Sequence, residues 1–458
     1  MPPNSYLSNR IKLIIIGGGI TGYSLAHEAA KLEIESIVLD NGQPGTTHAA
    51  TGILDARADH LTRDLDSVVE TAKQIIEWQN GFPYQSWIIK PKRFLLPIGP
   101  LTPHGSFLFD SLFKIYEKVA RLRINQLPDK HCIISSSLLE RMEPNLRRGG
   151  YFDSAVLFWL WTTDPDALLK KVHDEAVIMS SFSRRLPIKK IAGFTINNSY
   201  IESISIENNS GKIIKISHSG PLVIINTTGP WIEETLKDLG IKFGTELKLG
   251  IQAKFLGHYF QSDSGLITFG EDGKYIICLQ EKGYLQVGPT NNSFQGLPNN
   301  PGTAENDLNC LRKTLTYTLE KGYPLPSPQI LKHGWRIKPK YFIDTDRPVI
   351  WHHRKDGIEN LYTAVPGKMA LGLLTARELL MRLAHDGWLR KTMPVPKTNL
   401  SLDGGRIGRN RLKLLWFYLK SNFILGWHFI IITINRILGL GIGNENPALS
   451  KTGKKERG

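Results

Sequence analysis

The stretch Leu13–Asp40, LIIIGGGITGYSLAHEAAKLEIESIVLD, contains the strongest structural signal in the 458-residue chain. It begins with four consecutive apolar residues, which are typical of a strand buried on both faces of a parallel sheet. Gly17–Gly22 follows with the spacing G-x-G-x-x-G, and a helical pattern covers Ser24–Leu32. A second apolar strand, Ser36–Leu39, then ends in an acid. Strand, glycine turn, helix, strand and acid in this order predict a dinucleotide-binding βαβ unit.

Each part of this unit has a physical role. Gly17 permits the tight turn, Gly19 lets the backbone approach a pyrophosphate, and Gly22 lets helix and strand pack closely. The N-terminus of the helix offers N–H groups and a partial positive charge to phosphates. The terminal acid accepts hydrogen bonds from ribose hydroxyls. The predicted cofactor-binding residues of the unit are Gly17, Gly19, Ile20, Thr21, Gly22 and Asp40.

The composition is that of a globular protein with an excess of positive charge. The formal net charge is +15, which favours an anionic partner such as nucleic acid, anionic lipid or an acidic substrate. The three cysteines, Cys132, Cys278 and Cys310, lie far apart, so we predict no iron–sulfur cluster and no metal site. A reducing, cytoplasmic compartment fits this cysteine usage. The first residues lack the apolar core and cleavage site of a secretory signal, so none is predicted.

The C-terminal region differs in kind from the rest. The first part of Gly404–Gly443 is rich in basic residues, and the part that follows is strongly apolar. Fifteen uncharged residues lie between Lys420 and Arg436. That run is short for a bilayer span, but its flanking cations and aromatic residues suit a membrane interface. We predict that residues 400–458 form a basic-apolar tail in peripheral contact with the cytoplasmic face of a membrane. The alternative is a C-terminal helix docked on the body of the protein.

Further motifs follow the first in a fixed order. They are a small-residue stretch at Gly45–His60, TDPDAL at Thr163–Leu168, IINTTGPW at Ile224–Trp231 and VPGKMALG at Val365–Gly372. Together the motifs resemble the FAD-dependent oxidoreductases of the D-amino-acid oxidase and glycerol-3-phosphate dehydrogenase superfamily. The nearest resemblance is to the anaerobic glycerol-3-phosphate dehydrogenase large subunit, because Glu143-Pro144 precedes the DP helix by a similar gap.

The resemblance implies an α/β fold. It consists of a Rossmann-like FAD-binding domain of the glutathione-reductase type 2, an inserted and mostly antiparallel β-sheet substrate domain, and a C-terminal helical tail. The FAD-binding domain would be discontinuous, comprising residues 10–85, 150–245 and 334–390. The substrate or cap domain would comprise residues 86–149 and 246–333.

The resemblance also implies further contacts with FAD. The hydroxyl residues after Asp40 would approach the phosphates and the flavin, and the NTTGPW turn would close over the dinucleotide. The start of the last helix would face the flavin ring, where a helix dipole stabilises negative charge on reduced flavin. The residues concerned are Thr46, Thr47, Thr228, Gly229, Trp231, Gly367, Lys368 and Met369.

Cations at three motifs would hold an anionic substrate by charge-assisted hydrogen bonds. The resemblance places Arg336, Arg347 and Lys368 in this role, with Arg57 as a fourth candidate. Two departures from the family put glycerol-3-phosphate itself in doubt. Arg57 stands two residues before the family's arginine position, where Asp59 lies instead, and Ile337 replaces the proline that follows the late arginine.

Histidines supply the remaining candidates. Oxidation of a hydroxyl needs a base for its proton, and His258 and His60 are weak candidates. His48 lies in HAATG, which resembles a stretch that carries flavin covalently in some amine-oxidising relatives. If the acid-denatured protein retained the yellow colour of the flavin, a covalent bond at His48 would be supported. Complete release of the colour into the supernatant would exclude such a bond.

Three functions stay open at this stage. The first is a membrane-associated FAD dehydrogenase of a small anionic hydroxy compound such as glycerol-3-phosphate, which passes electrons to quinone or a partner subunit. The second is an oxidase or dehydrogenase of an amine or amino acid with the same fold. The third is a non-catalytic flavoprotein subunit, or a basic flavoprotein that binds nucleic acid, although no nucleic-acid-reading surface is recognisable.

Overall fold

The computed structural model describes residues 12–54, 65–81, 88–103, 105–123, 129–179, 183–294, 298, 305–340 and 347–389. The predicted tail at 400–458 lies outside these residues, as do Arg57 and His60. Within the described part, no helix has the length and apolar character needed to cross a membrane.

A six-stranded sheet contains the predicted βαβ unit. Its strands pair in parallel, except that the edge strand β18 runs antiparallel to β19. Across the sheet the strands are β18 (Val349–His352), β19 (Leu361–Val365), β11 (Leu222–Asn226), β1 (Lys12–Ile16), β2 (Glu35–Asp40) and β7 (Ser183–Pro187). The predicted strand–helix–strand unit is therefore confirmed as β1, α1 (Ile20–Lys31) and β2.

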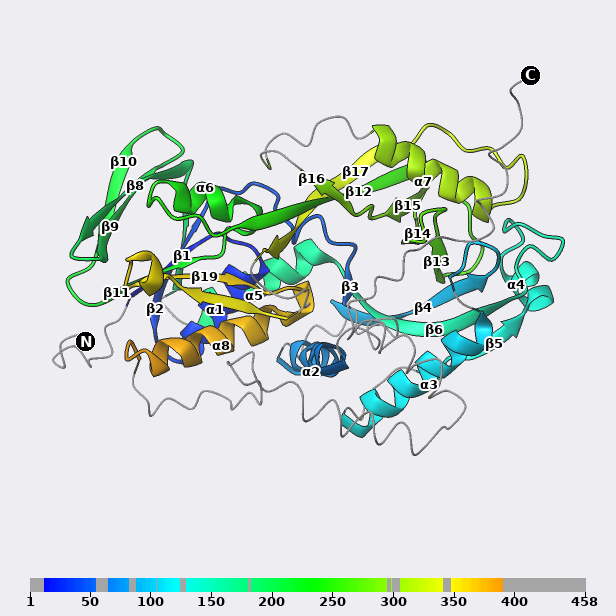
Figure 1. Ribbon diagram of the computed structural model, residues 1–458, viewed down its shortest axis with the longest axis horizontal. Coiled ribbons are helices and arrows are strands. Elements are labelled where there is room, and N and C mark those ends of the chain that lie inside the picture. The colour runs from blue at the N-terminus through cyan, green and yellow to red at the C-terminus, as the bar shows by residue number, and fades with distance from the viewer. Residues whose placement is uncertain are drawn as a thin grey trace, which may run out of the picture. The chain divides into compact units, whose positions relative to one another are not determined.

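Both faces of β1 are buried, as its apolar run predicts. Leu13 and Ile15 pack with three helices on one face, α1, α5 (Pro165–Met179) and α8 (Gly372–His385). Figure 1 shows α1 and α8 side by side against the strands. Ile14 and Ile16 pack on the other face with α6 (Ile232–Lys237) and with a three-stranded antiparallel sheet. That sheet comprises β8 (Lys190–Asn197), β9 (Tyr200–Glu207) and β10 (Ile213–Ser217).

A second, ten-stranded sheet is mostly antiparallel, because only β4 and β13 pair in parallel. Helix α7 (Glu305–Thr318) packs on its β12 and β13 strands through Leu311 and Leu315 (Figure 1). The strands are β3 (Ile53–Leu54), β4 (Ile89–Ile98), β5 (Cys132–Ser135), β6 (Ser154–Thr163), β12 (Thr245–Leu256), β13 (Gly265–Phe269), β14 (Tyr275–Glu281), β15 (Tyr284–Gly288), β16 (Asn292–Phe294) and β17 (Gln329–Pro339). The remaining helices are α2 (Leu65–Gly81), α3 (Ser106–Arg123) and α4 (Ser136–Met142). The predicted α/β class with a second antiparallel sheet is confirmed.

The sheets do not follow the predicted domain boundaries everywhere. β3 and β6 lie inside the ranges predicted for FAD binding, yet both pair in the ten-stranded sheet, where β6 aligns with all of β4. β17 crosses the predicted boundary at residue 334 and pairs with β12 along its whole length. An apolar or alternating pattern shows that a segment is a strand but not which strand is its neighbour, so this assignment could not be made from the sequence.

His131 joins β5 to α3 through two carboxylates. Its Nδ1 lies 2.9 Å from Glu117 Oε1 and its Nε2 lies 3.1 Å from Asp110 Oδ1, while its ring stacks on Phe113. Burial lowers the pKa of His131, but the hydrogen bonds to Glu117 and Asp110 outweigh burial and raise the pKa above its usual value. Because the folded pKa is raised, the stabilisation is complete below the unfolded pKa and is lost as pH rises through the folded pKa.

We therefore expect the free energy of unfolding to fall as the pH is raised from about 6 to about 9, by on the order of 1 kcal/mol from this residue. Urea denaturation of the wild type and of His131→Gln at both pH values measures the effect. The variant should show a weaker pH dependence, whereas the exposed His385→Gln should behave like the wild type. An unchanged pH dependence in His131→Gln would rule out this contribution.

Candidate functional site

The glycine turn after β1 fits against β2 and β11. Gly17 adopts φ +109°, and its N–H donates to Leu39 O at 2.8 Å. Thr227 Oγ1, after β11, donates to Gly17 O at 3.0 Å. A Cβ on Gly22 would lie 2.0 Å from Gly17 O, so helix α1 can pack on the turn only with glycine there. The structure thus gives a local reason for the first and last glycines of the motif.

The N-terminus of α1 is open to an anion. Gly19 caps the helix without a side-chain hydrogen bond, and no acidic residue lies in the first turn. Ile20 N–H donates to Thr47 Oγ1 at 3.2 Å, which brings the predicted Thr47 beside this helix end. A Cβ on Gly19 would meet only Thr47 Oγ1, at 3.5 Å, so the fold itself leaves room at this position. Such a helix end, with a glycine backbone that can be approached, suits a pyrophosphate.

Asp40 lies at the end of β2 in a polar environment. Its Oδ2 accepts from Arg185 Nη2 at 2.8 Å and from Tyr23 OH at 3.4 Å. Burial, followed by the charge of Asp40, raises the pKa of Tyr23. A Cβ on Gly18 would lie 2.6 Å from Asp40 Cγ, so this carboxylate sits directly against the glycine turn. Sequence reasoning missed Arg185, which comes from β7.

The loop after β2 connects the two sheets. Thr46 Oγ1 donates to Trp335 O of β17 at 2.6 Å, and Gln252 Nε2 of β12 donates to Ala49 O. A Cβ on Gly334 would lie 2.2 Å from Ala49 Cβ, so glycine is needed where β17 meets the loop. Gln286 Nε2 of β15 in turn donates to Gln252 Oε1 at 2.7 Å. The two glutamines were not predicted, because a lone glutamine in a strand carries no motif.

The later motifs end at the same edge of the sheet. Gly229, with φ +63°, starts the short helix η4 (Gly229–Trp231) after β11, and Gly367, with φ +71°, follows β19. The carboxyl ends of β1, β2, β11 and β19, which are neighbours in one parallel sheet, therefore carry the glycine turn, Asp40, the NTTGPW turn and Gly367. Ligands of open α/β sheets bind at this edge. The structure brings the four sequence motifs together.

Helix α8 begins next to α1. The helix η6 (Met369–Leu371) leads into it, and Lys368 is the N-cap residue of η6. A Cβ on Gly372 would lie 2.9 Å from both Ile20 Cγ1 and Ser24 Oγ, so the two helices approach closely here. Trp78 Nε1 of α2 donates to Ala370 O at 2.8 Å and fixes η6 from the other side.

Cations lie on the face of the ten-stranded sheet that meets the loop. Arg336, Gly334 and Lys332 alternate along β17, so their side chains share one face, the face on which Gly334 contacts Ala49. Lys332 pairs at 3.7 Å with Asp166 at the start of α5. Lys248 of β12 stands directly opposite Arg336 and was not predicted from the sequence.

The other predicted residues lie in separate places. Arg347 precedes β18, and its charge influences Glu378 of α8. Burial raises the pKa of Glu378 to about 7. The negative charge of Glu70 adds to this rise, and the positive charge of Arg347 opposes it. His258 is exposed beyond the end of β12, where its carbonyl oxygen accepts from Tyr323 OH at 3.1 Å. The hydrogen bond of β12 with the loop at Ala49 is made by Gln252, six residues before His258.

His48 and Glu143 have defined partners. His48 Nδ1 hydrogen-bonds Asp166 of α5, and its attachment to flavin stays a hypothesis. Glu143 is 1% exposed and accepts from Gln261 N at 2.7 Å, from Ser262 N at 3.1 Å and from Ser262 Oγ. Burial raises the pKa of Glu143 despite these bonds. The acid–proline motif therefore holds a turn of the ten-stranded sheet, so it is weak support for one particular branch of the superfamily.

The parallel sheet, the glycine turn and the open helix end define a dinucleotide-binding α/β protein with a second sheet over the loop. The chain belongs to the family described as FAD dependent oxidoreductase, whose model matches residues 12–380. It is thus an enzyme with FAD as its cofactor. The cradle at Gly19, the uncapped α1 and Asp40 fit this cofactor.

Glycerol-3-phosphate dehydrogenases are among the proteins to which this chain is similar. The chain is 22% identical over 438 residues to an aerobic glycerol-3-phosphate dehydrogenase of Staphylococcus aureus, covering 87% of this chain and 72% of the relative. The glycerol-3-phosphate dehydrogenase of Bacillus halodurans complexed with FAD gives a TM-score of 0.59 at 17% identity, covering 83% of this chain. This chain spans 65% of the Bacillus halodurans chain.

A second solved structure belongs to the other branch. L-proline dehydrogenase from P. horikoshii gives a TM-score of 0.58 at 18% identity, covering 84% of this chain and 95% of that chain. At such identities both structures show a shared fold. The predicted superfamily is confirmed, but the Staphylococcus aureus relative is named an aerobic enzyme, whereas the sequence motifs indicated the anaerobic subunit as the nearest resemblance.

Proposed function

We propose that this enzyme is an FAD-dependent dehydrogenase that removes a hydride from a small anionic hydroxy compound such as glycerol-3-phosphate. The observation that supports this proposal best is the cationic face of the ten-stranded sheet, where Lys248 and Arg336 oppose each other beside the loop that contacts α1. Two cations opposite each other on adjacent strands can both give an anion charge-assisted hydrogen bonds.

In this proposal, one set of residues binds the cofactor and another binds the substrate. The α1 N-terminus and Gly19 receive the pyrophosphate, Asp40 receives the ribose, and the turns at Thr228–Trp231 and Gly367–Met369 enclose the remainder. Bound FAD supplies the two-electron acceptor for the substrate hydride. Arg336 and Lys248 bind the substrate anion, assisted by Lys368, while Gln252 holds the loop at Ala49 in place. The predicted cations Arg347 and Arg57 stay secondary candidates.

Electrons then pass to quinone or a partner protein, and the tail at 400–458 contacts the cytoplasmic face of the membrane. This part of the proposal rests on the basic and apolar sequence of the tail and on the dehydrogenase names of the relatives. Family membership in an enzyme class disfavours the non-catalytic alternatives.

An amine or amino-acid substrate is the second candidate, because the proline dehydrogenase fold matches nearly as well and one arginine can hold a carboxylate. An anaerobic panel of glycerol-3-phosphate, 2-hydroxy acids and amino acids, read by loss of visible flavin absorbance, tests both candidates. We expect reduction by glycerol-3-phosphate or a related phosphorylated alcohol. Reduction by amino acids alone would replace the first proposal with the second, and no reduction by any compound would overturn both.

A further inference from the structure

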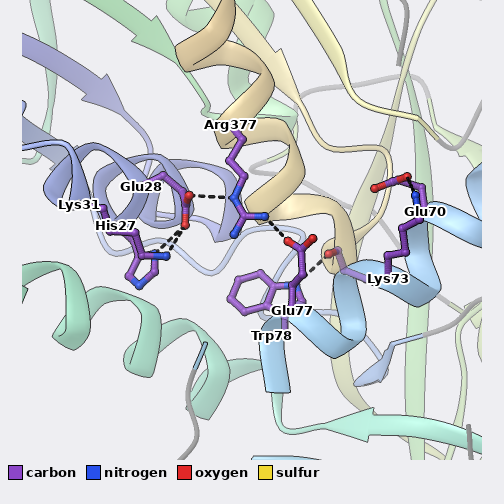
Figure 2. Close-up of polar contacts among 9 residues, drawn as sticks. His27, Glu28, Lys31, Glu70, Lys73, Glu77, Trp78 and Arg377 are labelled. Carbon is purple, nitrogen blue, oxygen red and sulfur yellow. Dashed lines mark hydrogen bonds and ion pairs between the residues drawn. The ribbon is translucent and has the colours of Figure 1, made fainter. Parts of the chain in front are cut away.

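Arg377 joins α8 to α1 and α2 through two ion pairs, of which the one with Glu28 is buried. Its Nε lies 2.8 Å from Glu28 Oε2 of α1, and its Nη1 contacts Glu77 of α2. Figure 2 shows the guanidinium between the two carboxylates. Glu28 also accepts from Lys31 at 2.8 Å and lies 3.2 Å from His27 Nδ1. Three helices that are far apart in the sequence thus share one charged cluster.

The Glu28–Arg377 pair is shielded from water, whereas Glu77 and Lys31 are 39% and 40% exposed. The side chains of Glu28 and Arg377 are 7% and 15% exposed. Burial raises the pKa of Glu28, but its hydrogen bonds with His27 and Arg377 outweigh burial and lower it, so the carboxylate is charged. A buried ion pair adds little net stability compared with apolar side chains of similar size, but its geometry is directional. The pair therefore fixes position more than it adds stability.

The pair fixes the starts of α1 and α8 relative to each other. α1 begins at the glycine turn, and α8 begins after Gly367–Met369. The helices touch at their first turns, where Gly372 lies against Ile20 and Ser24. Eight residues along α1 from Ile20, about 12 Å at 1.5 Å per residue, Glu28 makes the second contact through Arg377. The contact at Gly372 and the Glu28–Arg377 pair lie at different positions along the helix axes. Together they set both the distance and the angle between α1 and α8.

We propose that Arg377 is a positioning residue for the cofactor: it aligns the α8 start, which faces the flavin half of FAD, with the α1 start, which faces the ADP half. This inference rests on the cofactor placement in the proposed function, but not on the substrate. Because the two halves of FAD are covalently linked, binding of the whole molecule gains from a fixed distance between the half-sites. A ligand that occupies only one half-site does not have this gain.

The experiment measures binding of ADP and of FAD to the apoprotein of Arg377→Met. We expect the dissociation constant of ADP to stay within about twofold of the wild-type value and that of FAD to rise about tenfold, which is about 1.4 kcal/mol. The matched control is Arg382→Met, since Arg382 lies on the same helix and pairs with Asp386 near its end. It should leave both constants unchanged.

Two further variants keep the test decisive if Arg377→Met folds poorly. Arg377→Lys retains the charge and should recover part of the FAD affinity. The double variant Glu28→Gln with Arg377→Met leaves no unpaired buried charge and should show the same selective loss of FAD affinity as the single variant. The visible circular dichroism of the reconstituted flavin should also change in both Met variants.

Equal losses of ADP and FAD binding would show that Arg377 only supports the fold, and unchanged FAD binding would show that it has no role. Either result overturns the inference. Neither depends on substrate turnover, so the substrate panel can fail while Arg377 behaves as expected, and the two failures remain distinguishable.

Discussion

Replacement of Gly19 by alanine is expected to leave the protein folded and to weaken FAD binding by about 100-fold, or about 2.7 kcal/mol. Gly19 has an extended backbone with φ −78°, which alanine adopts without strain, and its new Cβ would have only Thr47 Oγ1 nearby, at 3.5 Å. The space at this Cβ is the space that the pyrophosphate needs above the α1 N-terminus. Equilibrium dialysis of the apoprotein with FAD, together with circular dichroism of the fold, measures both quantities.

Two other glycine-to-alanine variants serve as controls. Gly22→Ala should destabilise the fold itself, because its Cβ would lie 2.0 Å from Gly17 O. Gly105→Ala should change neither property, since no atom lies within 4 Å of its Cβ. If Gly19→Ala bound FAD as tightly as the wild type, the cofactor would not lie against this turn.

Replacement of Arg336 by glutamine is expected to lower kcat/KM for the anionic substrate by about 100-fold, or about 2.7 kcal/mol, with FAD content unchanged. Glutamine keeps hydrogen-bonding capacity at this position on β17 but removes the charge that meets the anion. Lys248→Gln, directly opposite on β12, should act in the same direction. Single-turnover reduction of the flavin by glycerol-3-phosphate measures substrate affinity and the rate of reduction separately.

Lys338→Gln is the matched control, because Lys338 lies two residues along the same face of β17 but opposite Glu246 rather than Lys248. It should leave substrate affinity unchanged. Equal losses in the Lys338 and Arg336 variants would mean that only the general positive charge of the face matters.

The cofactor motifs could be predicted from the sequence because their constraints are local. Gly17, Gly22 and Gly367 are required by the backbone within a few residues, and each follows an apolar strand whose end is readable. Their order along the chain was enough to recognise the family. The same holds for Asp40 at the end of β2.

Residues supplied from distant strands could not be predicted. Arg185 reaches Asp40 across 145 positions and Gln252 reaches Ala49 across 203, and neither belongs to a recognisable motif. Lys248 becomes a candidate only because the register of β12 with β17 places it opposite Arg336. The role of His258 as a base stays a prediction, and its exposure could not be predicted, because a histidine in a sequence carries no information on its exposure. The pairing of β6 with β4 could not be predicted either, because its apolar pattern fits either sheet.

The strand order of the six-stranded sheet has a consequence for synthesis on the ribosome. β11 is fully buried and needs β1 on one side and β19 on the other, yet β19 is translated about 135 residues after β11. Until Val365 has left the exit tunnel, the backbone edge of β11 has no partner strand and can pair with another nascent chain. The half-site at Gly367–Met369, which follows β19, can therefore receive the cofactor only after this long-range pairing is complete. Chains that terminate before β19 should accumulate as aggregates rather than as soluble apoprotein.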